Sequence, residues 1–428
     1  MSIGPKCEVP NMTLVNSQDV GSRIQADRVH GSLYTDQSLF EAELAKVWYK
    51  TWVYVGHVSE VPNSNDFILK SIGPQSVIMT RDRDGNIHLL LNRCAHRGNQ
   101  FCVSSKGNSS TFTCPYHGWT FSNNGRLRGY PFPNGYEGVQ RSGLGLGHVE
   151  RVAVYKGFVF GSFAKEGPTL EEHLGAARGI LDRLVQTSPD GEVEITAGFL
   201  QHRTKSNWKF LVENETDGYH PQFVHASIFN VAESGIGALY GPNSTAVARD
   251  LGKGHTEIDL RPEFRRIGEP LAWFGTTEDR FPGYTARMKQ AYGDEKANQI
   301  MIDGTPHAMI FPNLFIAEIQ IFVIQPVAVD ETIQHVTALQ FKGAPDLNRR
   351  LRQQTMGSVG PAGFLLADDS EMYERTQRGV QALSPEWNYL GRGKHRERRD
   401  SDGFLIGDAT DEITSRGIWR HYRALMET

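Results

Sequence analysis

Two short segments, each with one cysteine and one histidine, constrain this sequence more than any other feature. Cys94 and His96 lie two positions apart, and Cys114 and His117 lie three positions apart. Two thiolates and two imidazoles can converge on a tetrahedral zinc ion or on an iron–sulfur cluster. Zinc sites usually pair like ligands within a segment, whereas both segments here are mixed. A [2Fe–2S] cluster with both cysteines on one iron and both histidines on the other takes one ligand for each iron from each segment. The pattern therefore favours the cluster.

The residues around these pairs agree with a metal site. Gly98 and Gly118 follow the two pairs and allow backbone N–H groups to approach the bridging sulfides. Cys102 is interpreted as a small buried apolar residue rather than a fifth ligand. With Cys7 the chain has four cysteines in 428 residues, too few for a disulfide scaffold, and we expect a cytoplasmic protein. Two buried structural cysteines with two hydrogen-bonded histidines would be the plain structural alternative.

The charge balance excludes some classes of partner. The chain has 45 Lys and Arg residues against 49 Asp and Glu residues, a formal charge of −4. Nucleic acid is not expected as the main partner, because phosphate binding needs a basic surface. We expect no membrane association, because no apolar stretch approaches the roughly 18 residues of a membrane span. The N-terminus also lacks the pattern of a signal peptide.

The pattern of apolar and turn-forming residues changes twice along the chain. Residues 1–30 are polar and aperiodic, and we expect an arm or a poorly ordered tail there. A helix is predicted from Asp36, where apolar residues recur at helical spacing. Short β-rich runs separated by Gly, Asn, Asp and Pro follow over 52–163, which predicts a small antiparallel domain of tight hairpins. A helical stripe begins after Gly167, so a boundary is placed near residue 165.

The remainder of the chain mixes helix and strand. A long hairpin of a larger sheet is predicted from 313 to 343, with its turn at Asp330-Glu331. Residues 345–380 and 411–426 are predicted helical. The charge-dense segment 391–403 is interpreted as a solvated face rather than a docking patch.

A second candidate site contains His220 and His225. A non-haem Fe(II) that activates dioxygen needs two histidines and one carboxylate on one face, with other positions open. Five positions along a straight helix would place the two rings about 140° apart, which suits a shared metal poorly. Pro221 predicts a break in the helix that brings both imidazoles to one point. From spacing alone, ordinary structural histidines remain the alternative.

The first motif resembles that of Rieske proteins. It reads C-x-H, seventeen intervening residues, then C-x-x-H, within a β domain of about a hundred residues. The flanks Arg97-Gly98 and Pro115-Tyr116-His117-Gly118-Trp119 are similar to those of Rieske oxygenases. The second cysteine pair of respiratory Rieske proteins, which forms a disulfide, is absent. The resemblance implies a Rieske [2Fe–2S] cluster bound by Cys94, His96, Cys114 and His117.

The second motif is similar to the ferrous-iron motif of Rieske oxygenase α subunits. The matching run is Asn207-Trp208-Lys209, Glu213-Asn214, then Asp217-x-x-His220-x4-His225. In that family the third ligand comes from a later helix with a Gly-Pro-Ala-Gly-Phe…Asp-Asp sequence, which residues 360–369 match. The resemblance therefore implies an iron held by His220, His225 and Asp369. Asp368 and Glu371 are the alternatives as solvated acids of the first helical turn.

The resemblance also implies roles for Asp217 and Asn214. The matching aspartate of the family bridges the mononuclear iron to a Rieske histidine of the neighbouring subunit, here His117. Electrons would then cross a subunit interface, and the protein would be at least a trimer. Asn214 would be a weak or gating neighbour of the iron. The spacing of Asp217 from His220 independently allows a hydrogen bond to the imidazole.

The function that the resemblance implies is that of the catalytic α subunit of an aromatic-ring-hydroxylating dioxygenase. Electrons from NAD(P)H would arrive through a separate reductase, with a ferredoxin, because the chain has no G-x-G-x-x-G dinucleotide motif. The expected reaction is cis-dihydroxylation of an aromatic compound. The alternatives are a Rieske monooxygenase acting on an aromatic acid, an electron-transfer Rieske protein without mononuclear iron, and a zinc-dependent binding module. The substrate stays open.

The expected fold class is α+β. We predict an N-terminal arm and helix over 1–44, a Rieske domain over 45–165, and a catalytic domain over 166–428 with an antiparallel sheet surrounded by helices, of the helix-grip type. We expect an α trimer, or an α3β3 assembly with a small β subunit. Three expected walls of an apolar substrate pocket are the hairpin 314–324, Phe223 with Val224, and Phe364.

Overall fold

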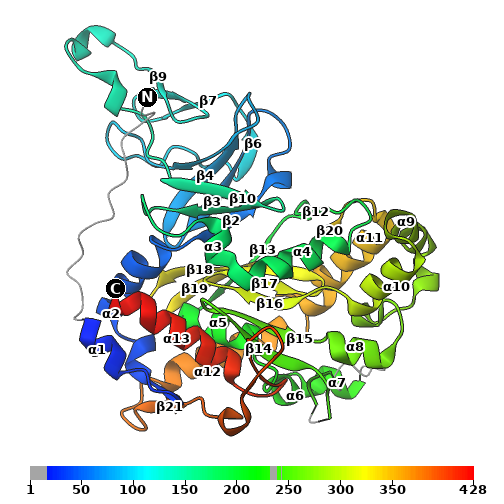
Figure 1. Cartoon of the computed structure of the whole chain (residues 1–428). Coiled ribbons are helices and arrows are strands. Elements are labelled where there is room, and N and C mark those ends of the chain that lie inside the picture. The colour runs from blue at the N-terminus through cyan, green and yellow to red at the C-terminus, as the bar shows by residue number, and fades with distance from the viewer. Residues whose placement is uncertain (1–16, 232–238, 242) are drawn as a thin grey trace. The chain divides into compact units, whose positions relative to one another are not determined.

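The computed structural model describes residues 17–231, 239–241 and 243–428, and these fall into two compact units. Of the described residues, the first unit contains Trp48–Leu170, and the second contains residues 17–47 together with those from Glu171 to Thr428 (Figure 1). The division in the structure therefore falls at Leu170 and Glu171. The predicted assignment of one function to each domain stays a prediction.

Short antiparallel strands build the first unit, as its alternation of β-rich runs and turn residues predicted. Gly85 and Gly125 occupy the left-handed region at φ +85° and +84°, where two predicted hairpins turn. The strand orders are β10-β11-β2, β5-β4-β3-β6 and β7-β8-β9. The bounds are β2 Val53–His57, β3 Asp66–Ile72, β4 Gln75–Arg81, β5 Ile87–Leu91, β6 Lys106–Asn108, β7 Thr111–Thr113, β8 Thr120–Ser122, β9 Leu127–Gly129, β10 Arg151–Tyr155 and β11 Phe158–Ser162.

The core of this unit contains both cysteines of the first motif. Cys94 and Cys114 are almost fully buried, together with Trp119 and Phe121. Apolar residues from β3, β4 and β5 close the same core. The loops of the first motif are therefore anchored by burial at their cysteine ends.

A nine-stranded antiparallel sheet forms the centre of the second unit, with the order β13-β19-β18-β17-β16-β15-β14-β23-β22. The predicted hairpin is present as β18 and β19, but its turn is at Val329-Asp330, one residue before the predicted position, and residues 314–317 form a separate strand, β17. The α+β fold class is thereby confirmed. The strand bounds are β13 Leu200–Thr204, β14 Val247–Gly252, β15 His255–Asp259, β16 His307–Ile310, β17 Leu314–Ala317, β18 Gln320–Ala328, β19 Glu331–Ala338, β22 Arg398–Arg399 and β23 Leu405–Asp408, with β12 Val193–Glu194 paired to β20 Gln340–Phe341.

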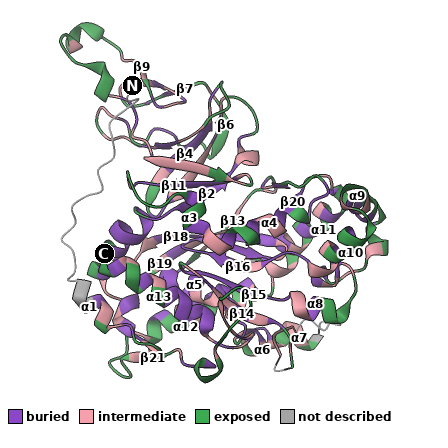
Figure 2. Cartoon of the chain, in the orientation of Figure 1, coloured by how far each residue is buried: buried purple, intermediate pink, exposed green. Residues whose placement is uncertain are grey.

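Helices cover this sheet. The helices α5, α12 and α13 pack against its strands, and Figure 2 shows buried residues along the sheet and its covering helices. Asn207 begins α5 by accepting a hydrogen bond from the N–H of Lys209. The helices are α2 Gln37–Glu43, α3 Leu170–Leu174, α4 Arg178–Gln186, α5 Trp208–Glu215, α6 Pro221–Val224, α7 Ala226–Val231, α8 Arg261–Ile267, α9 Pro282–Tyr292, α10 Asp294–Asp303, α11 Pro345–Gln354, α12 Leu366–Gly379 and α13 Ile413–Glu427.

The N-terminal segment is more ordered than expected from residue 17 onward. The short helix α1 (Ser17–Ser22) precedes β1 (Arg28–His30), which pairs antiparallel with β21 (Trp387–Tyr389). The prediction of a tail is therefore wrong for this part, because a strand distant in sequence satisfies its backbone. Residues 1–16 lie outside the described residues. The predicted helix at Asp36 is present, since the Asp36 carboxylate accepts from the first N–H groups of α2.

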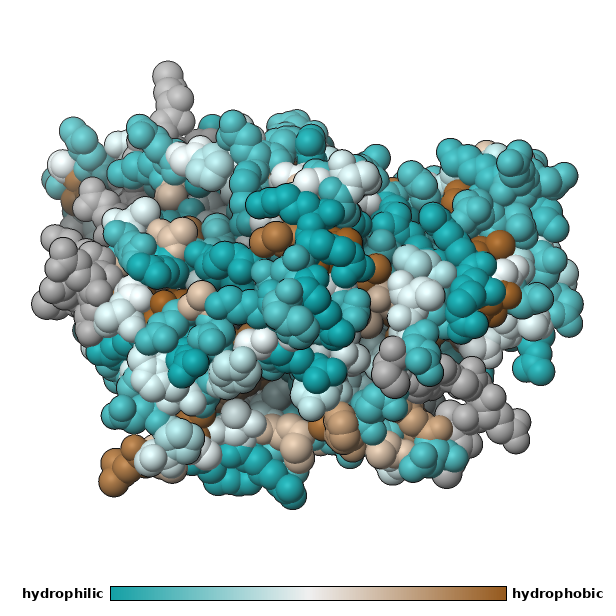
Figure 3. Space-filling view, turned by 60° about the horizontal axis from the view of Figure 1, so that its bottom comes forward, coloured by the Kyte–Doolittle hydropathy of each residue, from teal (hydrophilic) through white to brown (hydrophobic). Residues whose placement is uncertain are grey.

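The surface agrees with the charged composition. The face in Figure 3 is mostly hydrophilic, and hydrophobic residues appear on it in small groups. Among the helices of the described residues, none has the length and apolar character needed to cross a membrane.

Candidate metal centres

The two loops of the first motif have equivalent backbone structures. The N–H of Gly98 donates to the carbonyl of Cys94, and the N–H of Gly118 donates to the carbonyl of Cys114, both at 2.9 Å. The two glycines have φ values of +72° and +69°, a region that favours glycine. Each loop is therefore a tight turn that presents one cysteine and one histidine.

The four side chains of the motif lie together. The rings of His96 and His117 are 4.6 Å apart between centroids, and the thiols of Cys94 and Cys114 lie within hydrogen-bonding distance. The Nδ1 atom of His96 is buried without a hydrogen-bond partner. Trp119 stacks on the His96 ring, at 4.9 Å and 2° between planes. An unpartnered buried nitrogen beside two buried thiols suits a metal ligand set.

The spacing of these side chains fits a two-iron cluster better than a single zinc ion. The two thiols lie within hydrogen-bonding distance of each other, and the two imidazole rings pack against each other, so the ligands form one sulfur pair and one nitrogen pair. A [2Fe–2S] cluster with both cysteines on one iron and both histidines on the other takes its ligands in this way.

The two cysteine thiols differ in acidity. Burial raises the pKa of Cys94, and the neighbouring Cys114 raises it further. Burial also opposes ionisation of Cys114, but hydrogen bonds from the Tyr116 N–H and from Cys94 outweigh it, so the pKa of Cys114 is lowered. The Asn99 amide also donates to the Cys114 sulfur, at 3.6 Å. The thiolate form that metal binding needs is thus favoured first at Cys114.

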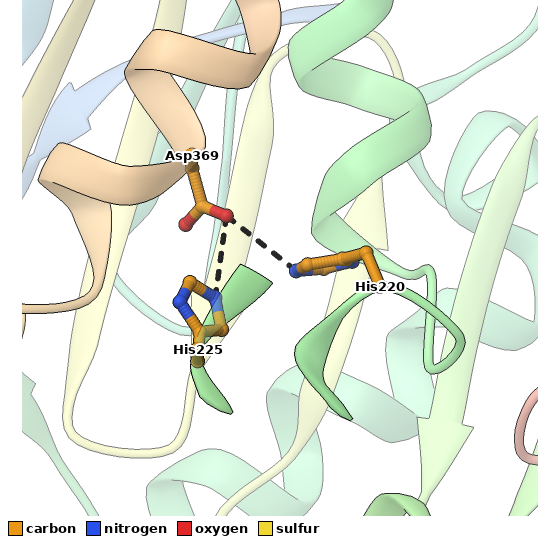
Figure 4. Close-up of side chains that lie close together, drawn as sticks. All are labelled: His220, His225 and Asp369. Carbon is orange, nitrogen blue, oxygen red and sulfur yellow. Dashed lines mark ion pairs between the residues drawn. The ribbon is translucent and has the colours of Figure 1, made fainter. Parts of the chain in front are cut away.

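The second centre brings His220, His225 and Asp369 to one point, as Figure 4 shows. The helix α5 ends at Glu215, and His220 stands at the start of the short helix α6, whose first residue is Pro221. His225 ends α6, while Asp369 lies in the first turn of α12. The predicted interruption of the helix is present, but it lies over residues 216–219, before His220, and Pro221 begins the next helical turn instead of ending the previous one. The two rings lie 5.3 Å apart between centroids.

The three ligand atoms lie close together, but they form no hydrogen bonds with one another. Asp369 Oδ1 lies 3.2 Å from His225 Nε2 and 3.5 Å from His220 Nε2. Asp369 Oδ1 is buried and forms no hydrogen bond in the described structure, and the same holds for the Nδ1 atoms of both histidines. Two imidazoles and a carboxylate that face a common point form the ligand set of a non-haem Fe(II) with open positions. The residues present therefore fit a mononuclear iron.

Negative charge dominates the surroundings of this centre. The pKa of His225 is raised: burial works against its protonation, but the Asp369 carboxylate, 3.2 Å from Nε2, outweighs that cost. Asp368 lies further away, with Oδ2 3.6 Å from His225 Nδ1. Glu215 is fully buried, and burial and the Asp369 charge raise its pKa well above the usual range. A cation bound by the triad would relieve this repulsion.

Two polar side chains predicted near the iron hold different positions. Asp217 Oδ2 lies 3.4 Å from His220 Nδ1, on the ring side away from Asp369, and Asp217 also accepts from the N–H of Tyr219 at 2.7 Å. The Asn214 amide donates to the Tyr373 hydroxyl of α12 at 3.0 Å. Asp217 thus contacts a triad residue directly, whereas Asn214 connects the two helices that flank the triad.

The structure also shows what sequence reasoning missed and where it was wrong. The positions of Glu215 and Tyr373 near the triad were not predicted from the sequence. Both residues lie on the buried faces of their helices, α5 and α12, and a buried helix face is the only feature of the sequence that could have indicated them. Two of the expected pocket walls are surface residues, since Phe223 is 68% exposed and Phe364 is 67% exposed. They flank the triad on α6 and before α12 but are not enclosed. The hairpin 314–324 is mostly buried, as expected.

Comparison with known proteins gives the class of the chain. Residues 51–150 match the family model of the Rieske [2Fe–2S] domain, and residues 189–426 match that of the ring-hydroxylating α subunit, catalytic domain. The large subunit of 2-halobenzoate 1,2-dioxygenase from Burkholderia cepacia is 33% identical over 88% of this chain and 83% of its own length. The large subunit of anthranilate 1,2-dioxygenase from Acinetobacter baylyi is 32% identical over 86% and 80%.

A solved structure agrees with these relatives. A naphthalene 1,2-dioxygenase variant bound to phenanthrene superposes with a TM-score of 0.82 and 26% identity, over 97% of this chain and 96% of that chain. The fold and the two centres thus define an oxygenase with a Rieske cluster and a mononuclear iron. The chain belongs to the α subunits of Rieske-type ring-hydroxylating dioxygenases.

Proposed function

We propose that this chain is the terminal oxygenase subunit that uses O2 and electrons from NAD(P)H to cis-dihydroxylate an aromatic compound. The observation that carries the proposal is the convergence of His220, His225 and Asp369, with ligand atoms within 4.8 Å of one another. Membership of the ring-hydroxylating family supports the same reaction class. No observation favours the monooxygenase alternative over it.

The proposal assigns each cofactor to named residues. Cys94, His96, Cys114 and His117 hold the [2Fe–2S] cluster, and the triad of His220, His225 and Asp369 holds the iron. When bound, the cluster supplies single electrons and the iron supplies the site of dioxygen activation. The domain bounds 45–165 and 166–428 are proposed as the functional division.

The residues of the chain orient and protect the iron site. The Asp217 carboxylate lies 3.4 Å from His220 Nδ1, and this contact orients the ring so that Nε2 faces the metal. Asn214, held by the Tyr373 hydroxyl, ties α5 to the helix that carries Asp369. These contacts limit the motion of two of the three ligands.

We further propose an electron path between subunits, from His117 of one chain through Asp217 of its neighbour to His220. The path requires a homo-oligomer, and we propose an α trimer, extended to α3β3 where a small β subunit is present. A ferredoxin and a reductase are the proposed electron donors, as the names of related multicomponent systems suggest. The cytoplasmic location stays a prediction.

The substrate is proposed as an aromatic small molecule. Relatives act on 2-halobenzoate, anthranilate and naphthalene according to their names. These differ in charge and ring number, so the class is taken no further than an aromatic ring that binds beside the triad with O2.

The test is the content of iron and acid-labile sulfide per chain in anaerobically purified protein. About three irons and two sulfides per chain support both centres. Oxygen uptake with aromatic substrates should then follow. About two irons with two sulfides, unchanged by added Fe(II), would leave the triad without support, and the electron-transfer alternative would take its place.

A further inference from the structure

A cavity in the second unit lies away from both metal centres. Its volume is about 290 Å3. It opens where the segment 24–29, the loop 390–397 and α13 meet, and Figure 1 shows α1 beside α13. The volume is at the lower end of the range of small-molecule pockets, about 300–1,000 Å3, and suits a molecule of one or two rings.

Basic side chains dominate the charged lining of the cavity, since five of them face a single acid, Glu397. The buried Arg416 forms an ion pair with Glu397, to which its Nε donates at 2.7 Å. The Arg416 Nη1 donates to the carbonyls of Leu390 and Arg392. The negative charge in the lining is therefore already neutralised. The basic residues are Arg28, Lys394, Arg416, Arg420 and Arg423.

The remaining cations are only partly paired. Arg28 pairs with Asp27, Arg420 with Asp250 and Arg423 with Glu427, at 2.9, 2.6 and 2.8 Å. The three arginines keep 41–47% of their side chains exposed. Arg28, and after it the exposed Lys394, lower the pKa of Asp27, so five cations meet four acids in and around the lining, Asp27, Asp250, Glu397 and Glu427. The cavity thus has a surplus positive charge that an anion can approach.

The walls between these cations are apolar. Ile24, Val29 and Trp419 are each at most 5% exposed, and Leu390 lies beside them. Trp419 is held in place because its indole N–H donates to Glu213 of α5. These three side chains are almost fully covered, so the apolar surface that a ligand reaches here is that of the partly exposed Leu390 and the exposed Ala26.

We propose that this cavity binds a small aromatic or alicyclic carboxylate, with its ring against Leu390 and Ala26 and its carboxylate at Lys394 and the neighbouring arginines. A polyphosphate is disfavoured by the small volume and the apolar walls. Charged hydrogen bonds from Lys or Arg to a carboxylate, together with an apolar wall, match such an amphipathic acid. The proposal does not depend on the function proposed above, because no lining residue belongs to either metal centre.

To test this proposal, crystals of the complete oxygenase are soaked with 4-bromobenzoate, and bromine is located by anomalous scattering. Calorimetry of the same acid with the oxygenase in solution measures its affinity. We expect a bromine peak in the cavity, none with the neutral 4-bromobenzamide, and a solution binding event beyond any in the active site. Filling the cavity by Ala26→Trp, at an exposed lining residue, should abolish the peak and that event.

Charge is tested separately from volume. Lys394→Gln should weaken the cavity affinity about tenfold, the value of one charged hydrogen bond. Arg398→Gln is the matched control, because Arg398 is an exposed cation of the same loop outside the cavity. Equal binding of the acid and the amide, an unchanged affinity in both lining variants, or a peak in crystals without binding in solution (binding at crystal concentration only) would overturn the proposal.

Discussion

The carboxylate of Asp217 lies 3.4 Å from Nδ1 of His220, while Nε2 of the same ring faces Asp369 at 3.5 Å. The His220 ring therefore contacts the Asp217 carboxylate with one nitrogen and faces the proposed metal position with the other. Such a partner orients the ring and raises its basicity. Its position also suits the proposed passage of electrons from a neighbouring subunit.

Replacement of Asp217 by asparagine should slow turnover by about 10–100-fold with little loss of iron. Asparagine keeps the size of the side chain but removes the charge that faces His220. The measurement is the rate at which the reduced cluster is reoxidised on mixing with O2 and substrate, beside iron per chain. A normal reoxidation rate in an oligomer with full iron would contradict the proposed path, and a monomer by sedimentation would contradict it independently.

Asp369→Ala should abolish oxygenation and lower iron from about three to about two per chain, with the visible spectrum of the cluster unchanged. The reason is that Asp369 supplies the single carboxylate oxygen that faces both histidines. Asp368→Ala is the matched control, since this adjacent acid is more exposed and stands 3.6 Å from His225 on the other ring nitrogen. Loss of iron in the Asp368 variant with retention in the Asp369 variant would reverse the assignment.

Local chemistry made much of this molecule predictable. The mixed Cys and His pairs, the glycines after them and Pro221 each restrict the backbone in a way that depends on near neighbours. The hairpin at residues 320–338 followed from alternation and turn residues. The motif resemblance then added Asp369, 144 residues after His225, which no spacing rule could reach.

Long-range pairing explains what was missed. The strand at Arg28–His30 pairs with Trp387–Tyr389, and each segment is only three residues long, too short for its alternation to predict a strand. Exposure of Phe223 and Phe364 depends in the same way on what packs over them. The buried acids Glu43 and Glu215 look like surface residues in sequence, because their partners come from distant segments.

Glu43 and Lys209 form a buried ion pair, and removal of one of its charges should cost more stability than removal of both. Lys209 Nζ lies 2.5 Å from Glu43 Oε1, and the Trp208 indole and the Tyr422 hydroxyl also donate to Glu43. Lys209→Met should destabilise the protein by about 3–5 kcal/mol, because it leaves a buried carboxylate without its counter-charge. Urea unfolding followed by circular dichroism measures the change.

The double variant Glu43→Leu with Lys209→Met is the control for this pair. It removes both charges, so it should recover much of the stability lost in the single variant. Additive losses in the two single variants and the double variant would show that the ion pair is not coupled.

Acid should destabilise the protein through His173 and His255, which are buried, and His421, which is half-buried; the three lie on α3, β15 and α13. Burial lowers the pKa of His255 to about 4 and that of His421 to about 4, and lowers that of His173 well below its usual value. Lys253 and the other histidines also oppose protonation, while Asp250 favours it at His421. All three should be neutral in the folded protein at neutral pH.

In the unfolded chain these histidines bind protons near pH 6.5, whereas in the folded chain they stay neutral until the pH approaches about 4. The stability that the neutral histidines contribute is therefore fully present above about pH 6.5 and is lost as the pH falls towards about 4. Each histidine should cost about 1.4 kcal/mol per pH unit in that window. Urea midpoints at several pH values measure the slope. His421→Gln should reduce it by about one histidine's share, whereas the exposed control His395→Gln should leave it unchanged; equal slopes in all three proteins would contradict the assignment.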